Sequence, residues 1–384
     1  MFAIPYFSLV AFFIFSFFAN NSKKSTFSAS LKYFCCLYLI VFVCFRGFVS
    51  TDWVSYYPAY QKMQIQRDLD FSYLKSFGWE IGTPLSMFIL KKLGFDYFAF
   101  CFVSSFIDLL VFFSFFKRYS KNFYLSLILF VLYNGLTMEF NLLRNSKAID
   151  LFLISLKYID CKKWKYFALN LVGCFFHFTA LFFMAFFFIY HIKLYNHKRI
   201  LLVLWFFGLT VFFLKIQFIA IVLNSIADFL PGRLSWLAMH YTTLNKHLAS
   251  YGMGLGFIER FVTFILVYKM QEKLLAQEPA NKIFLTMIYV YLLSFLYFAE
   301  IFELVGRITS LMSFGYWIIF PAVYTFLSAR HKKYFICIFI FYSILKIYAV
   351  FGNDLSLQYE NILFEYQSFS QRKMNNFDYK LKTL

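Results

Sequence analysis

Repeated apolar runs of about 20 residues, separated by short basic clusters, limit what this chain of 384 residues can fold into. A helix of that length crosses the hydrocarbon core of a bilayer, and it satisfies its own backbone hydrogen bonds there. Charged residues make up only 15% of the chain, whereas soluble domains carry about 25%. The pattern predicts an all-α polytopic membrane protein, a single integral membrane domain over residues 1–384 with about ten to twelve spanning helices.

The positions of lysine and arginine predict the side of the membrane on which each loop lies. The net charge of +18 comes largely from short clusters such as Lys117–Lys121, Cys161–Lys165 and Ala329–Lys333. Such clusters mark cytoplasmic loops, so the charge indicates topology and no nucleic-acid partner. The other polar stretches are predicted to be extracytoplasmic: residues 46–78, residues 231–253 and the C-terminal tail 351–384.

Two segments do not read as simple spans. Trp79–Leu93 is short and carries Glu80, which favours an interfacial or re-entrant helix. Tyr166–Tyr190 is long enough to cross, but a crossing would leave the basic segment His191–Arg199 outside. Two interpretations stay open. One is a re-entrant hairpin broken near Gly173–His177, and the other is a true span followed by crossings at Ile200–Leu214 and Ile216–Leu230.

The sequence contains no pattern typical of a metal, disulfide or nucleotide site. Most of its seven cysteines lie inside apolar runs without a Cys-x-x-Cys pair, and its six histidines are scattered. Neither a Gly-x-x-x-x-Gly-Lys nor a Gly-x-Gly-x-x-Gly motif occurs. We therefore predict no cofactor.

Charged side chains within or beside apolar runs are functional candidates, because each costs about 2.5–3.5 kcal/mol to place in a membrane. Those outside the basic clusters gather at the predicted external ends of helices, which indicates a polar cavity open to the outside. They are Arg46, Asp52, Glu80, Glu139, Arg144, Glu259, Arg260, Glu300, Glu303 and Arg307, with His177 deeper in its run.

The stretch Arg46–Tyr60 combines a guanidinium, a carboxylate and several aromatic hydroxyls at a helix end. Arg46 is predicted to hold a phosphate, because a guanidinium matches phosphate oxygens with two hydrogen bonds. Asp52 would then act as a base or accept a hydrogen bond from a sugar hydroxyl. The alternative is a structural ion pair between the two.

Arg144 stands at the predicted start of a helix, where backbone N–H groups and a guanidinium together suit an anion. A snorkelling arginine is the alternative. His177 lies among apolar residues, as structural histidines also do. Arg307 follows Glu303 by four residues, a spacing that a helical ion pair would explain as well as a substrate would.

Several motifs in order resemble the EpsG family, which is grouped with Wzy-type polymerases of O-antigen and exopolysaccharide. The motifs run from Phe45 to Pro321: Phe45-Arg-Gly-x-x-x-Thr-Asp-x-x-x-Tyr56, Trp79-Glu80, Leu143-Arg-Asn-Ser-x-Ala148, Phe176-His-x-Thr-Ala180 and Gly306-Arg-Ile308. The chain departs from the family where Ser50 replaces a usual glycine and Asn145 a frequent glutamine.

The resemblance implies a multi-helix architecture similar to the GT-C class, in the inner membrane of a bacterium with the active face outside. It implies a metal-independent glycosyltransferase that polymerises repeat units carried on undecaprenyl diphosphate, which serves as donor and acceptor. Arg46, Arg144 and Arg307 would then bind the diphosphate, Tyr56 and Glu80 would bind substrate, and Asp52 or His177 would be the base. A chain-length regulator is a further possible partner.

Two other functions compete with this one. A flippase for lipid-linked glycans would need charges along a pore with access from both sides. A membrane acyltransferase would need a base near one membrane face, for which the sequence offers only His177.

Overall fold

The computed structural model describes residues 2–20, 25–66, 69–229, 253–300 and 302–383, together with residues 232, 235 and 236. These residues are mostly helical and form no strand, only isolated bridges from Asn361 to Arg46 and to Glu365. The predicted all-α membrane fold is confirmed. The chain divides into two compact units, which are described separately: unit 1 is Met1–Phe188 with Phe320–Leu384, and unit 2 is Ile189–Ile319.

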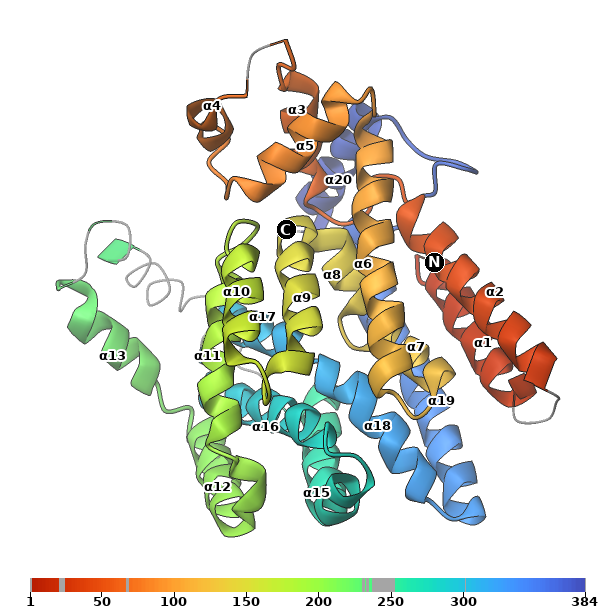
Figure 1. Ribbon diagram of the computed structural model, residues 1–384, viewed down its shortest axis with the longest axis vertical. Coiled ribbons are helices and arrows are strands. Elements are labelled where there is room, and N and C mark those ends of the chain that lie inside the picture. The colour runs from red at the N-terminus through yellow and green to blue at the C-terminus, as the bar shows by residue number, and fades with distance from the viewer. Residues whose placement is uncertain are drawn as a thin grey trace. The chain divides into compact units, whose positions relative to one another are not determined.

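Unit 1 is a bundle of long apolar helices with shorter helices gathered at one end (Figure 1). Helix α1 packs against α2, α7 and α19, while α6 packs against α2 and α9, and α9 against α8 and α10. The bounds are α1 Ile4–Asn20, α2 Ser25–Cys44, α6 Tyr97–Tyr119, α7 Phe123–Leu132, α8 Gly135–Asn141, α9 Leu143–Ser155, α10 Lys163–Gly173, α11 Thr179–His191 and α19 Ala329–Phe351.

The short helices α3 (Trp53–Lys62), α4 (Phe71–Lys75), α5 (Gly82–Lys92) and α20 (Phe369–Thr383) lie near the N-terminal end of α6 (Figure 1). Aromatic side chains hold this end together. Phe369 of α20 stacks on Tyr57 of α3, with ring centroids 4.8 Å apart. Stacked rings add stability beyond their buried area, so the C-terminal helix is an integral part of this end of the unit.

Unit 2 is built on α16 (Asn281–Tyr297), which packs against α12 (Lys198–Leu214), α15 (Leu255–Gln277) and α17 (Phe302–Met312). Trp205 of α12 stacks on Phe264, with ring centroids 4.0 Å apart. The unit also contains α13 (Phe218–Ala227). Its ten residues rise about 15 Å, half of a bilayer core, so α13 alone is too short for the crossing at Ile216–Leu230 that one of the two open interpretations includes.

In the described residues four helical segments are long and apolar enough to cross a membrane: Phe27–Cys44, Tyr97–Tyr119, Thr179–Asn196 and Ala329–Phe351. Two bent pairs raise the number to six if each is one span. They are α7 with α8, bent by 55°, and Val305–Met312 with α18 (Phe314–Phe326), bent by 46°. This is fewer than ten to twelve, because several apolar runs break into helices too short to cross.

The ambiguous segment Tyr166–Tyr190 is broken where the hairpin interpretation placed the break. Helix α10 ends at Gly173 and α11 begins at Thr179. The apolar stretch long enough to cross starts only at Thr179 and continues to Asn196, so one continuous span over Tyr166–Tyr190 is wrong. Within Trp79–Leu93, residues Gly82–Lys92 form the short α5, and its interfacial or re-entrant position stays a prediction.

Helix α2 begins at Ser25, because Ser25–Lys32 continues the helix without a glycine or proline. The predicted external loop 231–253 lies almost entirely outside the described residues.

Candidate functional site

Arg144 is the point at which the separate sequence motifs meet in unit 1. Its Nε donates to the Tyr56 hydroxyl at 2.6 Å, and one terminal nitrogen donates to Glu80 Oε2 at 2.7 Å. The guanidinium also lies over the Trp79 ring, 5.6 Å from its centroid. About a quarter of the arginine side chain (25%) stays accessible. The guanidinium is thus held in a fixed orientation with one part exposed.

Asp52 belongs to the same cluster and is half-buried at the start of α3. Burial raises the pKa of Asp52 to about 6, although the charges of Arg144 and Arg46 and a backbone hydrogen bond from Leu143 act in the opposite direction. A carboxyl with that pKa is mostly ionised near neutral pH and still basic enough to accept a proton. This is the property a general base requires.

The break between α10 and α11 brings His177 to the edge of this cluster. The Phe178 amide donates to Glu80 Oε1 at 3.3 Å. His177 Nδ1 accepts from the Thr179 amide at 3.1 Å, and the Thr179 hydroxyl donates to Asn145 Oδ1. The two predicted bases, Asp52 and His177, therefore both lie on segments that contact Arg144 or Glu80.

A glycine permits the close approach that joins α5 to the break. The Gly82 amide donates to the Phe175 carbonyl at 2.7 Å. A Cβ atom at Gly82 would lie 2.7 Å from that same oxygen, closer than real contacts allow. Gly82 thus positions Glu80 beside the residues that follow Phe175.

Arg46 does not face the accessible part of this cluster. It is 6% exposed and donates to Ser105 Oγ at 2.6 Å and to the Val43 carbonyl at 2.9 Å. Its guanidinium lies 5.5 Å from the centroid of the Phe140 ring. Arg46 is near enough to act on Asp52 electrostatically. Its positive charge therefore acts on the site from a buried position.

Arg307 lies in unit 2, exposed on α17. That Arg307 binds the diphosphate together with Arg144 stays a prediction.

Beside Arg46 lies a buried charge network of which Sequence analysis named only Glu139. Lys147 Nζ donates to Asp108 and, at 2.6 Å, to the Ser104 carbonyl. Glu139 and Asp150 are buried nearby and interact electrostatically with Lys147 and Asp108. The signal was present in the sequence, since Asp108 interrupts an apolar run and Lys147 and Asp150 share a helix face three residues apart.

The backbone explains why a glycine is usual at position 50. Ser50 has φ 71°, in the left-handed region that glycine adopts without steric cost. The residue is 2% exposed, and its amide donates to the Ser356 carbonyl at 2.7 Å. The serine therefore holds a strained turn directly before Thr51 and Asp52.

Ser50→Gly is expected to stabilise the protein by up to about 1 kcal/mol, because relief of left-handed strain of about 1–2 kcal/mol exceeds the entropy cost of glycine. Thermal unfolding of the purified protein in detergent measures the change. The matched control is Ser55→Gly on the exposed face of α3, which should destabilise the helix. A Ser50→Gly protein less stable than the native one would contradict the strain argument.

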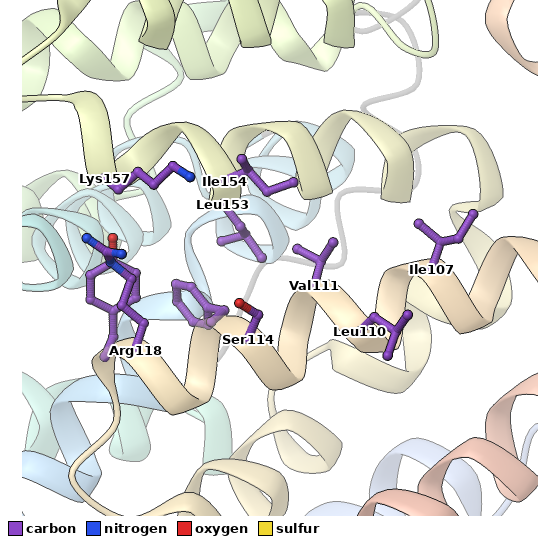
Figure 2. A pocket seen from close by; sticks show the side chains of 10 residues that line it. Ile107, Leu110, Val111, Ser114, Arg118, Leu153, Ile154 and Lys157 are labelled. Carbon is purple, nitrogen blue, oxygen red and sulfur yellow. The ribbon is translucent and has the colours of Figure 1, made fainter.

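An apolar groove adjoins the cluster. A cavity of about 470 Å³ is lined by α5, α6, α9 and α10 and reaches Thr83, Leu143 and Phe176, which neighbour the site residues in sequence. A second cavity of about 310 Å³ shares Ile107, Val111 and Ile154 with the first. Figure 2 shows that α6 and α9 side chains line it, with Arg118 and Lys157 at one end.

Comparison with known proteins identifies the family of the chain. The model of the EpsG family matches residues 30–368, which include every predicted site residue. No curated protein and no solved structure matches the chain. Since the match covers most of the chain, and the motifs it spans from Arg46 to His177 gather in one unit, the chain belongs to the EpsG family of Wzy-type polymerase-like membrane proteins.

Proposed function

We propose that the protein polymerises oligosaccharide repeat units carried on undecaprenyl diphosphate, on the outer side of a bacterial inner membrane. Family membership indicates a polymerase-like role in polysaccharide biosynthesis. The observation that carries the finer proposal is the meeting of Arg144, Tyr56 and Glu80 with a half-buried Asp52 beside an apolar groove. Arg144 supplies a cation that can bind a diphosphate, and Asp52 supplies a base for a hydroxyl. The adjacent groove offers a binding site for a lipid chain.

In the proposed reaction an acceptor hydroxyl attacks the anomeric carbon of the donor glycan. The new C–O bond forms as the bond from the sugar to the lipid diphosphate breaks, and Asp52 takes the hydroxyl proton. Arg144 stabilises the negative charge that develops on the leaving diphosphate. Glu80 and Tyr56 orient Arg144. The positive charge of Arg46 acts electrostatically on Asp52. His177 remains the second proposed base, and we propose no metal.

The groove between α6 and α9 is proposed to hold the isoprenoid chain of the carrier. Most of its lining is apolar, apart from Thr83, Ser86, Ser104, Lys147 and Asp150, and it reaches Leu143, the neighbour of Arg144 in sequence. A chain in the groove would place its diphosphate next to Arg144.

Deletion of the gene and complementation with the native or variant protein tests this function. A polymerase defect leaves single repeat units on the outer side, capping a lipid or a lipopolysaccharide core, while long chains disappear. A flippase defect leaves no external repeat units. Single external units in the deletion strain would support the proposal, and their absence would favour the flippase.

Asp52→Asn is expected to abolish long chains and to stabilise the folded protein. The native pKa of about 6 lies above the ordinary value of 3.8. Stability linked to Asp52 is therefore present below pH 3.8 and is lost as the pH rises through 6, so the ionised carboxylate destabilises the fold at neutral pH. Asparagine removes that charge, and it also removes the base.

Chain length in complemented cells and thermal unfolding at pH 7 measure the two effects. For the native protein, the rate of polymerisation in membranes should fall as the pH drops through about 6, because the base becomes protonated. His177→Gln is the companion variant. Long chains made by Asp52→Asn but not by His177→Gln would transfer the role of base to His177.

A further inference from the structure

The C-terminal strap, residues 355–372, is bound along the segment Phe45–Asp52 that carries the proposed base. The two lie more than 300 residues apart in sequence, and their backbones are joined by hydrogen bonds on both sides of Arg46. The Gly47 amide donates to the Glu360 carbonyl at 2.9 Å, the Ser50 amide to the Ser356 carbonyl at 2.7 Å, and the Ile362 amide to the Phe45 carbonyl at 2.8 Å.

The fit between strap and segment is close. A Cβ atom at Gly47 would lie 3.0 Å from Glu360 Cβ and 3.1 Å from Tyr366 Cβ, so the glycine allows the strap to approach the backbone. Two further side-chain bonds reach the end of α2. Tyr359 donates to the Phe42 carbonyl at 2.9 Å, and Asn361 to the Val41 carbonyl at 3.0 Å.

The side chain of Arg372 binds both the strap and the segment Phe45–Asp52 through hydrogen bonds. Its side chain is fully buried, at 0% exposure, although it is charged. Nε donates to the Phe48 carbonyl at 3.1 Å, and the terminal nitrogens donate to Gln358 Oε1 at 2.8 Å, the Gln358 carbonyl at 2.9 Å and the Leu355 carbonyl at 3.0 Å. Glu360 lies 3.5 Å away as the counter-charge.

This bonding pattern needs the planar fork of an arginine. One guanidinium connects the turn of the strap at Leu355–Gln358 to Phe48, two residues before the strained Ser50 and four before Asp52. A lysine offers a single ammonium and cannot reach these acceptors together. The match to the family ends at residue 368, so Arg372 and the whole of α20 lie beyond it.

We propose that Arg372 is a positioning residue for polymerisation, which holds the Phe45–Asp52 backbone and thereby keeps Asp52 in its half-buried place. This proposal rests on the proposed function, in which Asp52 is the base. A merely structural role would lower the amount or stability of the protein. A positioning role also changes the environment of Asp52.

The first test is hydrogen exchange of the full-length protein in nanodiscs, followed by mass spectrometry. Arg372→Gln is expected to speed exchange at least tenfold in peptides covering residues 46–53, where the Gly47 and Ser50 amides are bound to the strap. Peptides from α16 should exchange as in the native protein. Lys373→Gln, an exposed neighbour on the same helix, is the matched control and should change neither region. Unchanged exchange in residues 46–53 of Arg372→Gln would overturn the proposal.

The second test is the pH profile of polymerisation in membranes, using lipid-linked repeat units extracted from the deletion strain. The groups that face Asp52 are Arg144, Arg46, Tyr56 and Tyr97, and none of them changes in the variant. If Arg372→Gln lets water reach Asp52, the acid limb, which is the fall in rate at low pH, should move from about pH 6 toward the ordinary pKa of 3.8. The rate at pH 7 should also be lower. Lys373→Gln should keep the native profile.

Arg372→Lys covers the case in which the glutamine variant does not accumulate, since it keeps the charge and loses the fork. It should show intermediate exchange and an intermediate shift of the acid limb. Faster exchange with a native pH profile would reduce Arg372 to a structural role and overturn the proposal. A native protein without any acid limb would instead refute Asp52 as the base, while the exchange result would still decide whether Arg372 holds the segment.

Discussion

Arg144→Ala is expected to lower the rate of polymerisation by about 10²–10³-fold, the usual cost of removing one preorganised donor from a developing anion. Long polysaccharide chains should then be absent from cells that carry the variant as their only copy. The effect is large because Tyr56 and Glu80 fix the guanidinium before substrate arrives. Arg144→Lys should restore little activity, because one ammonium cannot bind both partners and a phosphate.

Separating chemistry from folding requires two further variants. Arg330→Ala removes an exposed arginine of the same unit that lines neither cavity, and it should leave chain length unchanged. Glu80→Gln keeps a hydrogen-bond acceptor for Arg144 and should reduce the rate less than Arg144→Ala does. Chain length and the amount of protein in the membrane are measured together. Long chains in Arg144→Ala at the native protein level would show that Arg144 is only a structural ion-pair partner.

Sequence patterns located most of this site because its parts are short and chemically distinctive. Charges are rare in apolar runs, so Arg144 and Glu80 were visible before their contact was known. The break near Gly173–His177 was visible as a conflict between apolar length and basic flanks, and α10 does end at Gly173. Ser50 was noted only as a departure from a usual glycine, and φ 71° supplies the physical reason.

Other features had no local signature. Contacts of Arg372 with Phe48 and of Asn361 with Val41 join residues more than 300 positions apart, and no periodicity links them. The polar tail was therefore read as a loop region, whereas it packs on the segment that carries Asp52. Apolar length also does not show where a helix bends, as the pair α7 and α8 does by 55°.

Arg46 shows how burial changes a prediction. The sequence placed it at a helix end as a phosphate ligand, but its guanidinium is 6% exposed and bound to Ser105 and Val43. Below it in the described part of unit 1, the buried acids Asp108, Glu139 and Asp150 outnumber the cations Arg46 and Lys147. Arg46 thus interacts electrostatically both with Asp52 of the site and with Glu139 of the buried network.

Lys147→Met is expected to destabilise the protein by about 3–5 kcal/mol, the cost of removing one partner from a buried ion pair. Asp108 is 2% exposed and would lie next to Asp150 and Glu139 without the ammonium group that now binds it. Methionine retains most of the volume and the apolar contacts of the lysine chain. The loss should therefore appear as a lower thermal unfolding temperature in detergent and a smaller amount of protein in the membrane.

The double variant Lys147→Met with Asp108→Asn separates charge from packing. Removing both charges of the pair should recover most of the stability, since a neutral buried pair no longer leaves an uncompensated carboxylate. Lys157→Met, ten residues further along the chain and outside the network, is the control and should unfold as the native protein does. If Lys147→Met alone is as stable as the native protein, the ion pair with Asp108 contributes nothing to the fold. If the double variant is no more stable than the single one, the loss comes from packing and the network is not electrostatic in origin.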